Sequence, residues 1–323
     1  MSDQPRTSST CPESPNGFRT EGVVLRAYGT RFVVRSNDRD KDTDLTCEVR
    51  ALVKKETMLE SPVVAGDVVE FTRISSSQGV IERVLPRRSM FCRPHKTGLS
   101  TRQVIAANID QLVIVASVGE PTLKTRLIDR FTVSARLGAL TPVVVVNKID
   151  RLADEGAQVE ELRDGYEKIG VLFFCVSAQT GEGVAELLQA LEGKKSLFVG
   201  HSGVGKSSLL NRLCPLLELA TQSVSAATGR GRHTTTHVAL YPLGAQIDGY
   251  VADSPGLKTM GLWEVSAGDL ADYFPEFEPY LGKCRFTGCA HVSEPGCAAK
   301  TAVENGAIPR FRYESYCHIR ETL

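Results

Sequence analysis

Long uninterrupted apolar runs are missing from this sequence, which excludes a membrane-spanning helix of ordinary length. Residues 1–17 are polar and lack the apolar core of a signal peptide, so we interpret them as a disordered arm. Nine cysteines in 323 residues are too sparse, and odd in number, for a disulfide scaffold. Internal repeats are also absent. These absences indicate a cytoplasmic protein of two or three domains that does not enter a membrane, with thiols that are reduced or bind metal.

A net charge is absent as well, because 38 Lys and Arg balance 38 Asp and Glu. The balance is not uniform along the chain. Residues 18–102 carry 16 basic and 11 acidic side chains, an excess of +5. A basic N-terminal module favours an anionic partner such as nucleic acid, although a solvated surface would have the same composition.

Residues 18–86 are predicted to form a small β-barrel. Five short β-branched segments, separated by Gly, Asn and Asp turns, lie at 22–25, 31–34, 46–49, 67–71 and 79–84. Five strands of this length favour an OB-fold, which commonly binds oligonucleotides, and an SH3-like barrel is the alternative. Residues 87–110, with several arginines and prolines, are interpreted as a linker.

From residue 111 the pattern changes to apolar strands that alternate with helical stretches. Strands are predicted at 112–115, 143–146, 172–176 and 195–199, with helices at 123–137, 159–169 and 207–213. A strand pair at 238–243 and 247–252 follows. This alternation predicts a parallel α/β sheet over residues 111–275. Residues 276–323 form a C-terminal domain with short helices at 301–305 and 310–321.

Residues 200–207 fit G-x-x-x-x-G-K-[ST], a loop whose backbone N–H groups cradle phosphates. The motif lies between a predicted strand and a predicted helix, as it requires. Lys206 would reach the β- and γ-phosphates, and Ser207 would bind Mg²⁺. The predicted phosphate-binding residues are Gly200, His201, Ser202, Gly203, Val204, Gly205, Lys206, Ser207 and Ser208.

A second motif predicts that the base is guanine. Asn147, Lys148, Ile149 and Asp150 form N-K-x-D directly after a strand, where Asp150 can accept hydrogen bonds from guanine N1–H and its 2-amino group. Adenine offers neither donor. Ser177 and Ala178, after the next strand, match the short loop that supports guanine in GTPases.

The catalytic residues are predicted around residues 228–236 and 253–256. Asp253 and Gly256 fit D-x-x-G, in which the aspartate holds Mg²⁺ through water and the glycine senses the γ-phosphate. Thr234 or Thr235 would complete the Mg²⁺ shell, and the sequence does not choose between them. Leu257 stands where Ras-type enzymes have a water-orienting glutamine, so His233, Arg230, Arg232 or a partner must serve instead. We expect slow intrinsic hydrolysis that a partner accelerates.

Four metal-binding side chains lie within 14 residues near the C-terminus. Cys284, Cys289, His291 and Cys297 have the pattern Cys-x₄-Cys-x-His-x₅-Cys, which suits a closed tetrahedral Zn²⁺ site with a structural role. The other cysteines have no ligand spacing. Arginines and tyrosines of residues 310–320 are predicted either to contact RNA or to pack back on the zinc module.

The order of the motifs is rotated, because the base-reading N-K-x-D precedes the phosphate loop that opens an ordinary GTPase domain. With this order and the cysteine spacing, the chain from about residue 22 resembles the bacterial ribosome small-subunit-dependent GTPase A family. The resemblance implies an N-terminal OB-fold, a circularly permuted GTPase domain and a C-terminal zinc domain. It also implies a monomeric factor that binds GTP or GDP with Mg²⁺, binds the 30S subunit and its 16S rRNA, and acts late in 30S maturation with subunit-stimulated hydrolysis. The apolar Leu257 agrees with the family pattern.

Two other functions remain possible at this point. One is a signalling GTPase that acts on a protein partner, with the barrel as an adaptor. The other is an RNA-binding module with a vestigial nucleotide site, against which the presence of Asp150, Lys206, Ser207 and Asp253 speaks.

Overall fold

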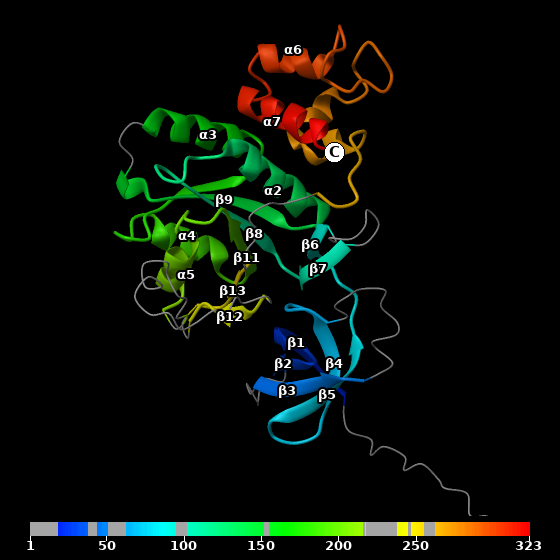
Figure 1. Cartoon of the computed structure of the whole chain (residues 1–323), viewed down its shortest axis with the longest axis vertical. Coiled ribbons are helices and arrows are strands. Elements are labelled where there is room, and N and C mark those ends of the chain that lie inside the picture. The colour runs from blue at the N-terminus through cyan, green and yellow to red at the C-terminus, as the bar shows by residue number, and fades with distance from the viewer. Residues whose placement is uncertain are drawn as a thin grey trace, which may run out of the picture.

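The computed structural model describes residues 19–37, 44–50, 63–94, 102–151, 155–215, 217, 238–244, 247–254 and 262–323. Three bodies follow one another along the long axis of the molecule: a β-barrel, an α/β domain and a helical C-terminal module (Figure 1). In the part of the chain that is described, no helix is long and apolar enough to cross a membrane.

The N-terminal barrel is closed and has the strand order β1-β2-β3-β5-β4. Its strands are β1 (Arg19–Tyr28), β2 (Arg31–Ser36), β3 (Asp44–Val49), β4 (Val68–Arg73) and β5 (Gln78–Val84). All five predicted strands are therefore confirmed. β3 pairs in parallel with β5 and not with its neighbour in sequence, β4. This Greek-key order is that of an OB-fold, whereas a simple meander would pair β3 with β4.

The barrel lies against the edge of the α/β domain. The Arg26 guanidinium stacks on the Tyr241 ring, 4.6 Å from its centroid, and an isolated β-bridge joins Arg26 to Ala239. Arg35 also donates to the Tyr250 hydroxyl at 3.4 Å. The first two strands of the barrel therefore contact the strand pair at the edge of the central sheet.

Residues 87–110, predicted as a linker, contain two strands. β6 (Met90–Pro94) and β7 (Arg102–Ala107) form a separate antiparallel sheet. The reason is apolar burial, because Phe91, Cys92 and Ala106 are fully buried in the core that this sheet shares with the α/β domain. The connection between the barrel and the α/β domain is thus a packed element.

The central sheet has six strands in the order β10-β9-β8-β11-β13-β12, all parallel except the edge strand β12. The strands are β8 (Gln111–Ser117), β9 (Thr141–Asn147), β10 (Leu172–Cys175), β11 (Lys195–Gly200), β12 (Leu240–Pro242) and β13 (Tyr250–Asp253). Consecutive residues of β9 enter different cores, since Val144 and Val146 face one core and Val143 and Val145 face the other. Burial on both faces explains the continuous apolar runs of the sequence.

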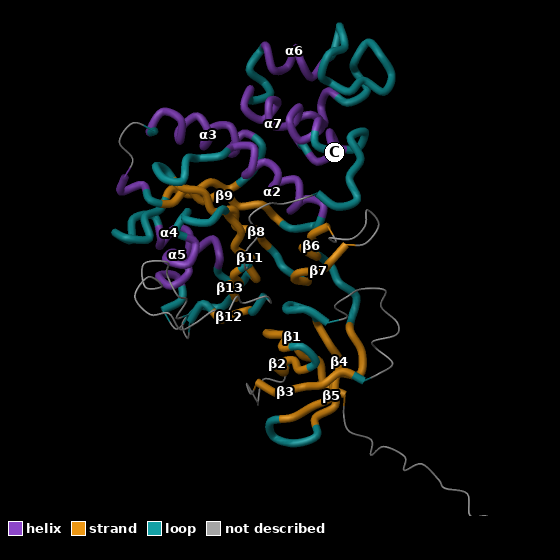
Figure 2. Tube along the Cα trace, in the orientation of Figure 1, coloured by secondary structure: helices purple, strands orange, loops and turns teal. Residues whose placement is uncertain are grey.

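Helices cover both faces of this sheet (Figure 2). They are α2 (Thr125–Leu137) and α3 (Gly156–Lys168) on one face, and α4 (Val184–Leu191) and α5 (Lys206–Leu213) on the other. Helix α4 was not predicted. Its apolar Val184, Leu187 and Leu191 have the i, i+3, i+7 spacing of an amphipathic helix, so the signal is present in the sequence.

The C-terminal module consists of short helices and a long loop, drawn in teal in Figure 2. Its elements are η2 (Leu270–Tyr273), η3 (Pro275–Tyr280), α6 (Ala298–Glu304) and α7 (Arg310–Glu321). The module packs on α2, whose Val133 belongs to the module's own core. The guanidinium of Arg312 is fully buried at this junction, between Asp129 of α2 and Glu276 of η3.

Candidate functional site

The predicted nucleotide motifs all follow strands of the central parallel sheet. The 147–150 motif begins at the last residue of β9, and residues 177–178 come after β10. The 200–207 motif begins at the last residue of β11, and Asp253 ends β13. Because these strands run in the same direction, their carboxyl ends meet at one edge, where α/β sheets bind ligands. The structure therefore brings the four motifs together.

The phosphate loop connects β11 to α5. Gly205 precedes the helix in the left-handed conformation, with φ of 84°. A Cβ atom on this residue would lie 2.4 Å from Asn147 Nδ2, so only glycine fits. His201, Ser202, Gly203 and Val204 form the turn, and Ser207 and Ser208 lie in the first turn of α5.

Asn147 joins the base-reading motif to the phosphate loop. Its buried Nδ2 donates to the Val204 carbonyl oxygen at 2.9 Å, and its Oδ1 accepts from the Ala178 N–H at 3.0 Å. One side chain therefore fixes three motifs relative to one another. Lys148 follows with φ of 66°, and its Nζ donates to the Glu120 carbonyl oxygen at 2.5 Å.

Asp150 lies in the short 3₁₀ turn η1 (Ile149–Arg151). The Ser177 hydroxyl donates to Asp150 Oδ1 at 2.5 Å and accepts from the Thr180 N–H at 3.0 Å. These two bonds hold the carboxylate in one orientation. A carboxylate fixed at this edge of the sheet can accept the two adjacent N–H groups of a guanine base.

At the other end of the site, the Lys206 ammonium forms an ion pair with the Asp253 carboxylate. Lys206 Nζ also lies 3.4 Å from the Ser254 carbonyl oxygen. Burial lowers the pKa of Lys206 to about 8. A cation that can bind phosphate and a carboxylate that can bind a divalent ion thus lie side by side.

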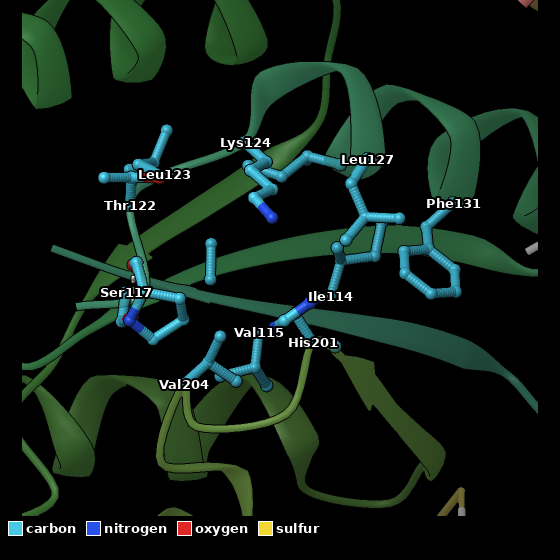
Figure 3. Close-up of a pocket in the computed structure, with 14 residues that line it drawn as sticks. Ile114, Val115, Ser117, Thr122, Leu123, Lys124, Leu127, Phe131, His201 and Val204 are labelled. Carbon is cyan, nitrogen blue, oxygen red and sulfur yellow. Dashed lines mark hydrogen bonds between the residues drawn. The ribbon is translucent and has the colours of Figure 1, made fainter. Parts of the chain in front are cut away.

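An apolar cavity borders the phosphate loop. Figure 3 shows Lys124, which directly precedes α2, and Leu127 of its first turn across this cavity from His201 and Val204 of the loop. Ile114 and Val115 of β8 form its floor. The beginning of α2 is therefore a direct neighbour of the predicted phosphate-binding residues.

The remaining predicted catalytic residues, His233, Thr234, Thr235 and Gly256, lie outside the described residues, as do Arg230, Arg232 and Leu257. Of the predicted catalytic residues, Asp253 is the one that lies within the described part of the chain.

The four metal-binding candidates form a compact cluster in the C-terminal module. The ligand atoms of Cys284, Cys289, His291 and Cys297 all lie within 4.8 Å of one another. Cys284 Sγ is 3.8 Å from Cys297 Sγ and 3.5 Å from His291 Nδ1. Two sulfurs bound at about 2.3 Å to one tetrahedral ion lie about 3.8 Å apart, so the cluster fits such an ion. Burial lowers the pKa of His291, which favours the neutral imidazole that binds metal.

Glu294 shapes this metal-binding loop, a role that sequence reasoning missed. Its carboxylate accepts from the backbone N–H groups of Ala290 at 2.8 Å, and of Val292 and Ser293 at 3.1 Å. These hydrogen bonds lower the pKa of Glu294 to about 2, so it remains ionised at any physiological pH. The sequence signal that could have predicted this role is the acidic residue in the five-residue spacer between His291 and Cys297.

Tyrosines of α7 hold the same loop. The Tyr313 hydroxyl donates to the His291 carbonyl oxygen and the Tyr316 hydroxyl to the Ala290 carbonyl oxygen, both at 2.9 Å. Arg312 is buried and Arg320 donates to the Ala267 carbonyl oxygen. The sequence left two roles open for this helix, contact with RNA or packing back on the C-terminal module. These four residues of α7 have the packing role.

Comparisons with known proteins agree with this architecture. The sequence model described as RsgA GTPase matches residues 84–263, more than half of the chain. The chain belongs to the RsgA GTPase family. A relative from Chlorobaculum tepidum, "Small ribosomal subunit biogenesis GTPase RsgA", is 40% identical over 310 residues, covering 94% of this chain and 97% of the relative. "Small ribosomal subunit biogenesis GTPase RsgA 1" of Vibrio vulnificus is 39% identical over 319 residues, covering 96% and 86%.

Two solved structures have the same fold. YjeQ from Thermotoga maritima superposes with a TM-score of 0.78 at 34% identity, over 95% of this chain and 99% of that chain. YloQ, a circularly permuted GTPase, superposes with a TM-score of 0.74 at 24% identity, over 97% of both chains. The predicted family, the three-part fold and the rotated order are confirmed. As a member of the RsgA GTPase family, the protein is a GTP hydrolase.

Proposed function

We propose that this protein binds the small (30S) ribosomal subunit and assists its late maturation, and that contact with the subunit accelerates its hydrolysis of GTP to GDP and phosphate. The observation that carries this proposal is the joining of base-reading and phosphate-binding motifs through Asn147, in a chain whose relatives are named for small-subunit biogenesis. The protein would act as a monomer on 16S rRNA, with domains at 18–86, 111–275 and 276–323.

In this proposal the sheet edge holds the nucleotide from end to end. Asp150, oriented by Ser177, selects guanine, and Ala178 supports the base beside Asn147. The backbone of residues 200–205 and the Lys206 ammonium hold the phosphates. Lys206 would exchange its carboxylate partner, Asp253, for the phosphate oxygens when GTP enters.

Ser207, Asp253 and one of Thr234 and Thr235 would hold Mg²⁺, which neutralises charge on the β- and γ-phosphates. Gly256 would sense the γ-phosphate. We assign the orientation of the attacking water to His233, since Leu257 has no polar group to do so.

The decisive experiment is GTP turnover measured with and without purified 30S subunits. We expect slow basal hydrolysis and an increase of about tenfold or more with 30S subunits, because the partner completes a site that lacks a glutamine at position 257. Purified 50S subunits are the matched control and should leave the rate at its basal value. Equal rates with and without 30S subunits would contradict the proposal.

Two additions to this assay separate the remaining hypotheses. His233→Ala should lower the stimulated rate, and an unchanged rate would remove His233 from the water-positioning role. Salt-sensitive co-sedimentation with 30S subunits distinguishes a ribosome-binding GTPase from a signalling GTPase that acts on a protein partner.

We also propose that the metal is zinc, in a structural role. Three thiolates and one imidazole form a donor set that zinc favours, and four protein ligands leave no open coordination position. Elemental analysis of the purified protein should find about one zinc per chain. Cys297→Ser should lose the metal and increase hydrogen exchange in residues 281–297. Cys317→Ser, in the same module but outside the cluster, is the control and should keep both; a Cys297→Ser variant that retains full zinc would contradict the assignment.

A further inference from the structure

An open groove of about 370 Å³ lies between the beginning of α2 and the end of α7, where the GTPase domain meets the C-terminal module. Its lining comprises four basic side chains on an apolar floor and no acidic side chain. Lys124, Arg126, Arg130 and His318 are the basic residues. In a chain whose charges balance overall, a concave surface with one sign of charge is a local concentration of positive potential.

The two exposed cations of the groove, Lys124 and Arg126, have no ion pair within the described part of the chain. In the described ranges, no carboxylate lies within 4 Å of Lys124, Arg126 or His318. Arg130 is partly buried and ties the two walls together, because its Nη1 donates to the Thr322 hydroxyl at 3.0 Å. The groove is therefore formed by two domains that are held in a fixed relation.

The groove is also continuous with the surroundings of the phosphate loop. Leu123, Lys124 and Leu127 line both the groove and the cavity beside His201 and Val204. A partner that occupied the groove would thus contact α2 next to the nucleotide site.

We propose that this groove, here called the α2–α7 groove, binds the phosphodiester backbone of RNA on the small subunit. The inference rests on the proposed function and names a contact surface for it. A run of phosphates supplies the row of anions that basic groups from two helices require, and guanidinium groups pair with phosphate oxygens through paired N–H donors. An acidic protein surface fits less well, because carboxylates are seldom arranged in a continuous row.

Arg126 provides the test, since it is exposed, lines the groove and does not line the cavity beside the phosphate loop. Arg126→Gln should weaken 30S binding about fivefold at 0.15 M salt and lower the slope of log K against log salt by about 0.9, the value for one phosphate contact. Arg126→Glu should weaken binding further through repulsion. Glutamate in the first turn of α2 favours the helix dipole, so this variant is expected to fold.

Lys168→Gln and Lys168→Glu are the matched controls, because Lys168 is an exposed basic residue on another helix of the same domain. Both variants should bind 30S subunits with an affinity within about twofold of the wild type and with the same slope of log K against log salt. Basal GTP hydrolysis of all four variants should equal that of the wild type. If the wild type binds 30S subunits and both Arg126 variants bind with its affinity and slope, the groove assignment is wrong. If the wild type itself fails to bind, the proposed function is wrong instead.

The chemistry of the partner is decided by crosslinking. A photoreactive residue at position 126, used at low salt where the loss of one contact is tolerated, should crosslink to 16S rRNA in complexes with 30S subunits. Crosslinking to a ribosomal protein alone would overturn the assignment to RNA.

Discussion

Replacing Arg312 by methionine is expected to lower the free energy of unfolding by about 3–5 kcal/mol, the largest effect on stability that we predict. Arg312 is fully buried, with Nη1 2.5 Å from Asp129 Oδ1 and Nε 2.6 Å from Glu276 Oε1. Methionine fills a similar volume but leaves two carboxylates without their cation. Urea denaturation of the intact protein measures the loss, and hydrogen exchange should localise it to the contact between α2 and α7.

Arg310→Met is the matched control, because Arg310 begins the same helix and is exposed. It should change stability by no more than about 0.5 kcal/mol. Adding Asp129→Asn and Glu276→Gln to Arg312→Met should restore much of the loss, since no charge then remains buried without a partner. Equal stability of Arg312→Met and the wild type would show that the buried ion pairs do not hold the C-terminal module.

The deficit of Arg312→Met should also depend on pH. Burial raises the pKa of Asp129, and the Arg312 guanidinium opposes that rise. In the variant the opposition from Arg312 is lost, while the hydrogen bonds from Tyr166 and Ser315 still lower the pKa of Asp129. The net rise is therefore larger, and the folded state holds the proton more tightly than the unfolded chain, whose pKa is about 3.9. Stability of the variant relative to the wild type is then greatest in acid and falls as the pH rises through the folded-state pKa.

Asp150→Asn is expected to exchange the base specificity of the nucleotide site. An asparagine amide cannot accept from both guanine N–H groups, so affinity for GDP should fall by roughly 100-fold or more, equivalent to about 3 kcal/mol. Xanthine carries a carbonyl oxygen in place of the 2-amino group, and the asparagine N–H can donate to it. Affinity for XDP should therefore rise. Calorimetric titration with GDP and XDP in the presence of magnesium measures both changes.

The control for this exchange is Asp164→Asn, the same chemical change on the exposed side of α3. It should leave both affinities unaltered. Unchanged preference for guanine in Asp150→Asn would remove Asp150 from the base-reading role, whatever the protein does with the subunit.

Much of the fold was predictable because local patterns and tertiary environment agree. The valines at 143–146 form an uninterrupted apolar run, and the structure shows why, with neighbouring valines entering cores on opposite faces of the sheet. The motif at 200–207 predicted both a strand before it and a helix after it, and β11 and α5 are those elements. Glycine at 205 is required by the close approach of Asn147.

Other features depended on contacts between distant residues. The choice between two kinds of barrel rested on the parallel pairing of β3 with β5, which no strand pattern encodes. The strands β6 and β7 lie in a segment whose arginines and prolines suggested a linker, and burial of Phe91 decided otherwise. From the sequence, Arg312 could have been an RNA contact. Its buried position between Asp129 and Glu276 gives it a structural role instead.

The sequence by itself predicted the chemistry of this protein: a phosphate loop, a guanine-reading motif in rotated order, and four candidate ligands for one metal ion. Such motifs are short and local, because each binds its target with a few adjacent residues. The tertiary structure alone decided how Asn147 joins the motifs, how α7 is locked onto α2, and where the α2–α7 groove lies. Each of these features depends on contacts between side chains that are far apart in sequence. The burial of a side chain and the charges around it are fixed only when the chain has folded.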